Sequence, residues 1–241
     1  MLLNKPYFKR FTSLTPSDYL SDHHIHSTWT DGEGNVREII EKARDAGLSQ
    51  VAVTDHVRAC SKYGFEYEKE IRQLSKEYDF EVLVGFEAKV ADYNGRLDIS
   101  EQYRGLADFV IGSVHSIPVK TKSRIVFQKT DTFSRGKLQE LEYQLSLAII
   151  KNGQADILGH PGGMSLALHG NFDLGLMEEI IKICSCSNTA FEVNSRYHKD
   201  IIDWILKKLK QYNPLVSFSS DAHNLSQIGS CVKMLKQKVP Q

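Results

Sequence analysis

The sequence predicts an α/β fold in which parallel strands alternate with helices. Short apolar segments recur seven times along the chain, and most are followed by apolar residues spaced three and four apart, which is typical of amphipathic helices. The central residues of the expected strands, such as 51–53 and 109–111, are apolar on both faces. This pattern indicates a parallel sheet that is buried on both sides, with helices packed outside it.

Each element follows from its local pattern. The expected strands are residues 22–27, 50–54, 81–87, 108–114, 156–159, 190–194 and 215–219. The expected helices are residues 36–46, 67–75, 136–152, 174–185, 199–211 and 225–238. The long helix at 136–152 carries Leu138, Leu141 and Leu145 on one stripe, and Gly153 provides its C-terminal stop.

Residues 118–135 interrupt this alternation with a polar and basic stretch. Its cations are Lys120, Lys122, Arg124, Lys129 and Arg135. We expect a surface loop here, either over an active site or as an ordinary solvated insertion.

Composition and charge exclude several classes of protein. The 241 residues carry 30 Lys and Arg against 30 Asp and Glu, and this zero net charge argues against a surface built to bind nucleic acid. With 41% hydrophobic and 25% charged residues, the chain is not of the disordered class. No apolar run approaches the ~20 residues that span a bilayer, and the N-terminus lacks the apolar core of a secretory signal. We therefore expect a cytoplasmic protein with no membrane partner.

No linker or shift in composition divides the chain. We therefore expect a single domain over residues 1–241, with a core at about 21–230 and a short N-terminal extension at 1–20. The cysteines lack the regular spacing of a disulfide framework, and we expect free, buried thiols. They are Cys60, Cys184, Cys186 and Cys231.

Histidines and acidic residues gather at the ends of the predicted strands. His24 and His26 lie two apart on the first strand and face one side, whereas His23 should point to the other. The other candidates at strand ends are Asp55, His56, Glu87, His115, His160, Asp221 and His223. In a closed α/β barrel these ends converge on one rim, and imidazole with carboxylate suits Zn, Mn or Fe. The sequence therefore predicts a metal site at that rim.

Eight short motifs occur in order along the chain. They are D-H-H-I-H-S (22–27), T-D-G (30–32), T-D-H (54–56), G-F-E (85–87), G-S-V-H (112–115), G-H-P (159–161), E-V-N (192–194) and S-D-A-H (220–223). In this order the sequence resembles the PHP (polymerase and histidinol phosphatase) superfamily of metal-dependent phosphoesterases, over about residues 21–230. The resemblance implies a distorted, TIM-like (β/α) barrel of seven strands, with the metal site at the C-terminal rim of the strands.

The resemblance also implies three divalent metal ions, which would be Zn, Mn or Fe. It assigns His24, His26, Glu87 and Asp221 to the first ion, Glu87, His115 and His160 to the second, and Asp31, His56 and His223 to the third. Glu87 would bridge the first two ions. Three divalent ions would bring six positive charges, of which three carboxylates would neutralise three and a bridging hydroxide one. The site would keep about two positive charges, which a phosphate dianion would neutralise.

Further residues are candidates for supporting and substrate-binding roles. Asp22 and Asp55 adjoin ligand histidines, and we expect them to act in catalysis by orienting imidazole N–H groups. Arg196 is the expected catalytic phosphate clamp, because a guanidinium can grip two oxygens at once. Arg58 and Lys89 follow ligand strand ends and are further candidates for substrate binding.

Three other polar residues are expected outside the ligand set. Glu192 lies within a strand, which favours a role in supporting a ligand over a role as one. His169 and His198 fall in expected loops, and we expect both to be solvated.

The resemblance implies hydrolysis of a small phosphomonoester by attack of a metal-bound hydroxide on phosphorus, as in a histidinol phosphatase. Three alternatives stay open at this point. One is a protein-tyrosine phosphatase of the same fold, and another is a phosphodiesterase or exonuclease that acts on nucleic acid ends. The third is an inactive metal-binding regulatory module. The expected partner is a small phosphorylated substrate rather than a nucleic acid or a membrane.

Overall fold

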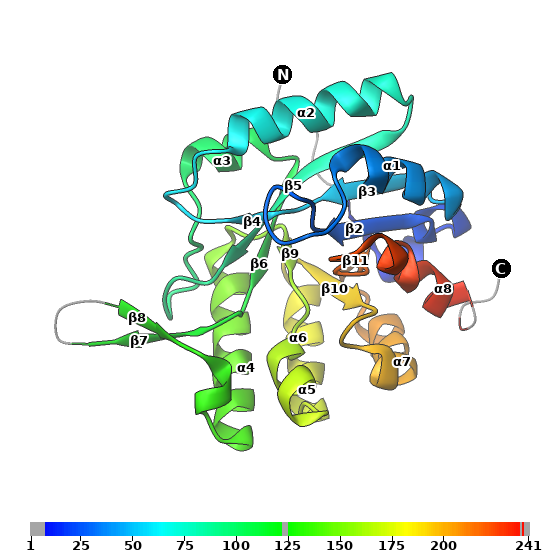
Figure 1. Cartoon of the computed structure of the whole chain (residues 1–241). Helices are drawn as coiled ribbons and strands as arrows, with labels where there is room; N and C mark the ends of the chain where they lie inside the picture. The colour runs from blue at the N-terminus through cyan, green and yellow to red at the C-terminus, as the bar shows by residue number, and fades with distance from the viewer. Residues whose placement is uncertain (1–7, 122–124, 237, 239–241) are drawn as a thin grey trace.

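Strands and helices alternate along the chain as the apolar pattern predicts (Figure 1). The structure, a computed structural model, describes residues 8–121, 125–236 and 238. The strands are β1 (Lys9–Arg10), β2 (Ser21–Ile25), β3 (Gln50–Val53), β4 (His56–Val57), β5 (Glu81–Lys89), β6 (Phe109–Ser113), β7 (Ile117–Lys120), β8 (Ile125–Gln128), β9 (Ile157–Leu158), β10 (Ala190–Asn194) and β11 (Leu215–Ser219). The helices are α1 (Val36–Asp45), α2 (Gly64–Glu77), α3 (Glu101–Leu106), α4 (Arg135–Asn152), α5 (Gly163–His169), α6 (Leu174–Ser185), α7 (Ile202–Tyr212) and α8 (Ser230–Lys236).

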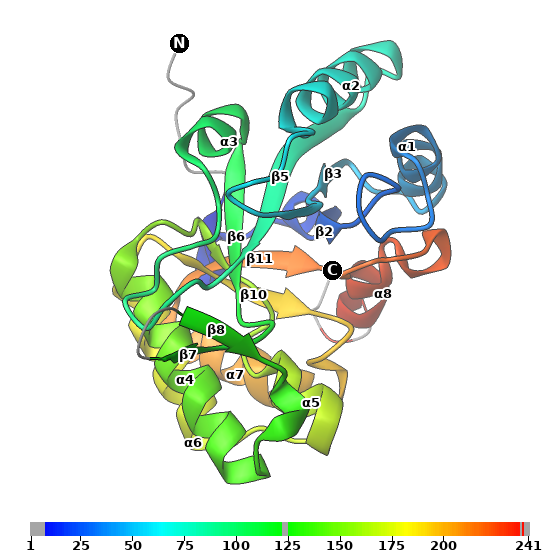
Figure 2. The ribbon, with the colours of Figure 1, turned by 60° about the vertical axis from the view of Figure 1, so that its left-hand side comes forward.

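The strands at the seven predicted positions form one parallel sheet. Their order is β11-β10-β9-β6-β5-β3-β2, with β1 antiparallel to β11 and β4 beside β5. The sheet curls until its ends meet, where the His26 N–H donates to the Ala222 carbonyl over 2.9 Å and Ile25 pairs with Ala222. The helices lie outside the strands (Figure 2). The architecture is the predicted α/β barrel, and its closure is irregular, because an isolated bridge joins Ile25 of β2 to Ala222, which lies beyond the end of β11.

A bulge in β2 changes where its histidines point. The register between β2 and β3 shifts between Asp22 and Ile25, so the strict alternation of side chains is broken. His23 lies away from the candidate ligands, as predicted, but it does not lie on the opposite face of the sheet, because its ring packs on the inner cluster of the barrel. Its ring contacts Phe8 and Phe109, with centroids 5.7 and 6.2 Å away, and its Nε2 lies 2.7 Å from the side-chain oxygen of Gln50.

A small apolar cluster, separate from the main core, is built almost entirely from strand residues. Its members are Phe8, Ala52, Leu83, Phe109, Ile111, Ile157 and Ala190. Because these side chains come from neighbouring strands, they fill the interior of the barrel, whereas the larger core packs between the strands and the helices. Phe8 closes the cluster from the N-terminal segment, which therefore belongs to the barrel. The sequence carries no periodic signal for this contact, because the segment contributes only a two-residue strand.

Residues 118–135 differ from the expected loop. Strands β7 and β8 pair in this segment as an antiparallel ladder, which projects from the barrel after β6 (Figure 1). Lys122 and Arg124 lie outside the described residues. The polar composition misled the prediction because an exposed two-stranded hairpin needs few buried side chains.

The shorter elements show further differences. Helices α3 and α5 were not predicted, because six and seven residues are too few for a periodic pattern to stand out. The C-terminal helix begins at Ser230 rather than 225, after a separate 3₁₀ turn. Cys184 and Cys231 are buried as predicted, whereas Cys60 and Cys186 are exposed. Among the described helices, none is both long and apolar enough to span a bilayer.

Replacing Phe8 tests whether the N-terminal segment closes the barrel. Phe8 is 6% exposed and its ring lies 5.4 Å from that of Phe109, so Phe8→Ala should lower the free energy of unfolding by about 3 kcal/mol. Phe65, which is 50% exposed, is the matched control, and Phe65→Ala should change the free energy of unfolding by less than about 0.5 kcal/mol. Urea unfolding followed by circular dichroism measures both. Equal losses in the two variants would show that Phe8 does not contribute to the core.

Candidate metal centre

The carboxylate of Glu87 lies at the centre of the C-terminal rim. One of its oxygens, Oε1, is 2.9 Å from Nε2 of His115 and 3.0 Å from Nε2 of His160. The other, Oε2, is 3.0 Å from Nδ1 of His56. These imidazoles follow β6 and β9 or lie on β4, so residues far apart in the sequence meet at one carboxylate.

The two histidines of the H-x-H motif approach Glu87 from β2. Their Nε2 atoms lie 3.4 Å (His24) and 3.5 Å (His26) from Oε2 of Glu87. Asp221, which follows β11, places Oδ1 3.2 Å from Nε2 of His26. Glu87 thus stands between two groups of imidazoles, in the position that a bridging ligand would need.

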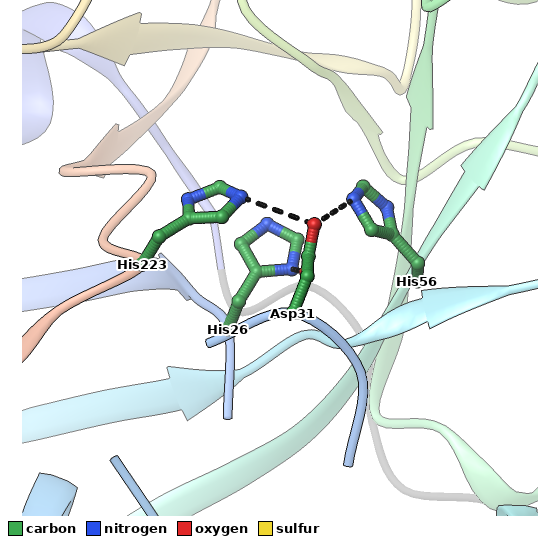
Figure 3. A group of neighbouring side chains, drawn as sticks. All are labelled: His26, Asp31, His56 and His223. Atoms are coloured by element: carbon green, nitrogen blue, oxygen red, sulfur yellow. Dashed lines mark ion pairs between the residues drawn. The ribbon is translucent and has the colours of Figure 1, made fainter. Parts of the chain in front are cut away.

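A third group forms around Asp31, on the loop after β2 (Figure 3). Its Oδ2 lies 3.3 Å from Nε2 of His56 and 3.6 Å from Nε2 of His223. Its Oδ1 lies 3.5 Å from Nδ1 of His26. The side chain of Asp31 is half exposed, so this group lies at the open side of the rim.

Ligand atoms within 4.8 Å of one another define three sets among the described residues. The sets are His24, His26 and Glu87; His56, Glu87 and His115; and His26, Asp31, His56 and His223. Each overlaps one of the three expected ligand groups, although His26 and His56 each belong to two sets. Asp221 and His160 adjoin the sets through the contacts given above.

The donor atoms at this rim fit divalent metal ions. The Nδ1 atoms of His26 and His56 are buried beside carboxylate oxygens, but among the described residues neither makes a hydrogen bond, a costly arrangement that coordination to a metal would relieve. Burial lowers the pKa of His26 to about 4, so its imidazole is in the neutral form that binds metals. Burial opposes ionisation of Glu87, but the charges of His115 and His24 hold its pKa well below the usual range.

Glu192 holds His24 and His160 in place from β10. Its Oε1 lies 2.7 Å from Nδ1 of His24, which therefore donates its proton there and leaves Nε2 facing Glu87. Its Oε2 accepts the backbone N–H of His160. These contacts match the supporting role expected for Glu192.

Backbone strain accompanies two of the candidate ligands. His160 and Asp221 have φ values of 25° and 53°, in the left-handed region that non-glycine residues rarely adopt. Gly32 of the T-D-G motif shows a related constraint, since a Cβ there would lie 2.2 Å from the carbonyl oxygen of His26. The loop carrying Asp31 can therefore pack against β2 only with glycine at this position.

A family model of the PHP domain matches residues 22–219. The chain belongs to the PHP family. DNA polymerase/3'-5' exonuclease PolX of Bacillus subtilis is 24% identical over 216 residues, which are 86% of this chain but only 35% of that relative. A protein of Caldicellulosiruptor bescii named "probable phosphatase" is 28% identical over 201 residues, covering 82% of this chain and 76% of that protein.

Solved structures agree with the fold of this PHP chain. The crystal structure of hisK from Listeria monocytogenes, named a candidate histidinol phosphatase, has a TM-score of 0.62 at 16% identity. The match covers 91% of this chain and 100% of that one. At this identity the likeness establishes a shared fold. Family membership and the three ligand sets together support divalent metals as cofactors of this chain.

Asp22 and Asp55 have partners other than those predicted. Asp22 accepts the backbone N–H groups of Ser220 and Gly229, each over 2.9 Å. Asp55 accepts the N–H and hydroxyl of Ser27 and the hydroxyl of Thr30. Within the described part of the chain neither carboxylate bonds to an imidazole, so both position the ligand-bearing backbone instead. Burial raises the pKa of each to about 6.

The candidate substrate-binding cations lie at two places on the rim. Arg196, after β10, places Nη1 3.2 Å from Oδ2 of Asp221. Arg58 and Lys89 lie together at the ends of β4 and β5. Burial and the charge of Arg58 lower the pKa of Lys89.

Two supporting residues lie where the sequence gave no indication. His198 is buried rather than solvated, with Nδ1 accepting the N–H of Asn194 over 3.2 Å and Nε2 donating to the carbonyl of Pro161 over 3.0 Å. It thus links the E-V-N and G-H-P motifs. The ring of Tyr197 lies 5.1 Å from that of His160. His169 is exposed as predicted, although it ends helix α5 rather than lying in a loop.

The buried state of His198 predicts a specific pH dependence of stability. Burial lowers its pKa to about 4, below the unfolded value of about 6.5, so its contribution is complete above pH 6.5 and is lost as the pH falls towards 4. The difference in unfolding free energy between wild type and His198→Gln should therefore shrink by roughly 3 kcal/mol as the pH falls over this range. Urea titrations of metal-free protein at pH 7.5 and 4.5 measure the difference, with exposed His169→Gln as control. A difference that stays constant with pH would contradict the prediction.

Proposed function

We propose that this chain is a metal-dependent phosphatase that hydrolyses small phosphomonoesters. One observation carries the proposal: a buried, ionised carboxylate, Glu87, stands between groups of imidazoles with Arg196 on the same rim. A buried carboxylate surrounded by imidazoles is a donor set that suits closely spaced divalent ions. Membership of the PHP family supports phosphoesterase chemistry, and so do the phosphatase names of its relatives.

Three groups of residues would hold the metal ions, which we propose to be Zn, Mn or Fe. They are His24, His26, Glu87 and Asp221; Glu87, His115 and His160; and Asp31, His56 and His223. Ions bound there would supply a water of lowered pKa and positive charge for the phosphate oxygens. The three carboxylates leave the site positive, which favours a phosphate dianion as substrate.

The protein's own residues orient the site before substrate enters. Glu192 fixes the proton of His24 on Nδ1, so Nε2 faces the centre. Nδ1 of His223 lies 3.0 Å from the carbonyl oxygen of Asp221, which can only accept, and 3.0 Å from Nη1 of Arg196, which can only donate. A protein acceptor therefore sets the tautomer of His24, and Arg196 contacts the ring of His223 directly.

Arg196 is placed to bind the phosphate. Its Nη1 donates to Asp221, which holds the guanidinium at the rim, and no acceptor among the described residues bonds to its Nε or Nη2. The side chain is 44% exposed, so these donors can reach a substrate. A guanidinium held in this way would grip two phosphate oxygens and orient the phosphorus above Glu87.

The polymerase relative supports one alternative function. PolX of Bacillus subtilis is named a 3'-5' exonuclease, and the match spans most of this chain. A phosphodiesterase acting on nucleic acid ends would use the same metal ligands. The zero net charge of this chain disfavours it, because nucleic acid binding is driven largely by positive charge.

Paired histidine variants test the proposed activity. His115→Ala removes a ligand atom 2.9 Å from Glu87 and should lower kcat/KM by at least about 100-fold, whereas exposed His169→Ala should leave it unchanged. Elemental analysis should find fewer metal ions per chain in His115→Ala only. The assays use phosphorylated metabolites, including histidinol phosphate, with Mn, Zn or Fe supplied.

Other substrates in the same assay separate the alternatives. A phosphotyrosine peptide tests the protein-tyrosine phosphatase, and a labelled oligonucleotide tests the exonuclease. Turnover of the oligonucleotide alone would replace the proposed function with the exonuclease. If metals bind and no phosphate ester is hydrolysed, the chain is a metal-binding module and the proposal is wrong.

A further inference from the structure

Two cations stand side by side above the metal ligands on β4 and β5. In the parallel ladder of these strands, His56 pairs with Glu87 and Val57 with Ala88. The next residues along the two strands are Arg58 and Lys89. Lys89 is the last residue of β5, where side chains two apart face the same way, so it lies on the side of Glu87. Arg58 directly follows β4 and is near enough for its charge to act on Lys89.

These cations have little neutralising charge around them. The described residues place no carboxylate within ion-pair distance of the Lys89 ammonium, which lies 3.4 Å from the centre of the Phe127 ring. Arg58 has Asp98 at 3.9 Å, the outer limit of an ion pair. One oxygen of Asp98 already accepts the N–H of Ala59. Two positive charges therefore share one partly used carboxylate.

The hairpin supports this position from the neighbouring strand. It leaves the rim directly after β6, which carries His115 at its end, and β8 brings Phe127 over Lys89. Phe127 remains 39% exposed, so the ring that Lys89 contacts is open to solvent. A cation on an aromatic face keeps its charge available to an incoming anion.

We infer that Arg58 and Lys89 form a second anion site, which selects phosphomonoesters carrying a further acidic group. This inference rests on the proposed function and narrows its substrate class. Two residues along a strand correspond to about 7 Å, so the proposal places the second anionic group about that far from a phosphate held at the metal site around Glu87. A substrate with an ammonium group at this distance is repelled.

Phosphonates that cannot be hydrolysed test the site by binding alone. Calorimetry with the Mn-loaded protein compares benzylphosphonate with its 4-carboxy and 4-aminomethyl derivatives, which place the second group at about the required distance. Wild type should bind the carboxy compound about tenfold more tightly than the neutral one, as expected for one charge-assisted hydrogen bond. The aminomethyl compound should bind more weakly than both.

Variants locate the source of this preference. In Lys89→Met and Arg58→Gln the carboxylate advantage should shrink, and in the double variant it should fall below about twofold, less than half a kcal/mol. Lys62→Met is the matched control, because Lys62 is an exposed lysine on the same loop, and it should keep the full advantage. The inference is overturned if wild type shows no advantage, binds neither phosphonate, or keeps its preference in the double variant.

The corresponding phosphates separate this inference from the proposed function. If the carboxy phosphonate binds preferentially but none of the phosphates is hydrolysed, the second anion site stands and the phosphatase proposal fails. If phenyl phosphate is hydrolysed without any effect of the carboxylate or of the variants, the phosphatase proposal stands and the second site does not exist.

Discussion

The Glu87 carboxylate is the interaction on which the rest of the rim depends. A buried carboxylate is unfavourable unless its charge is compensated. Five imidazoles at the ends of β2, β4, β6 and β9 provide that compensation. The parallel sheet makes this arrangement possible, because all of its strands end at the same rim. Metal ions would complete the compensation, so the fold and the proposed chemistry share one electrostatic requirement.

Carboxylates that are not themselves candidate metal ligands are as important for the geometry as those that are. Asp22 accepts hydrogen bonds from the segment after β11, and Asp55 accepts them from the loop after β2. Glu192 accepts hydrogen bonds from the imidazole of His24 and from the backbone N–H of His160. These bonds stabilise backbone that would otherwise relax, including the strained residues His160 and Asp221. The rim is thus held in position by buried acids that hydrogen-bond to backbone.

The two ends of the barrel are built differently. At the N-terminal end, Phe8 and the strand residues of the inner cluster fill the interior with apolar side chains. At the C-terminal end the interior is polar, and the hairpin after β6 extends one side of it. The bulge in β2 serves both ends, because it turns His23 towards Phe8 while His24 faces Glu87. The second anion site would use the same strand ladder that aligns His56 with Glu87.

The sequence by itself determined the seven parallel strands and the residues that meet at their ends. Both follow from local rules, namely the apolar run of a buried strand and the common direction of parallel strands. Only the tertiary structure decided that Asp55 binds Ser27 rather than an imidazole, that His198 is buried, and that Phe8 closes the barrel. Each of these depends on which distant segments become neighbours, and no pattern within one segment encodes that. The bulge in β2 near His23 and His24 also depends on tertiary structure, since it is defined by the register between β2 and β3.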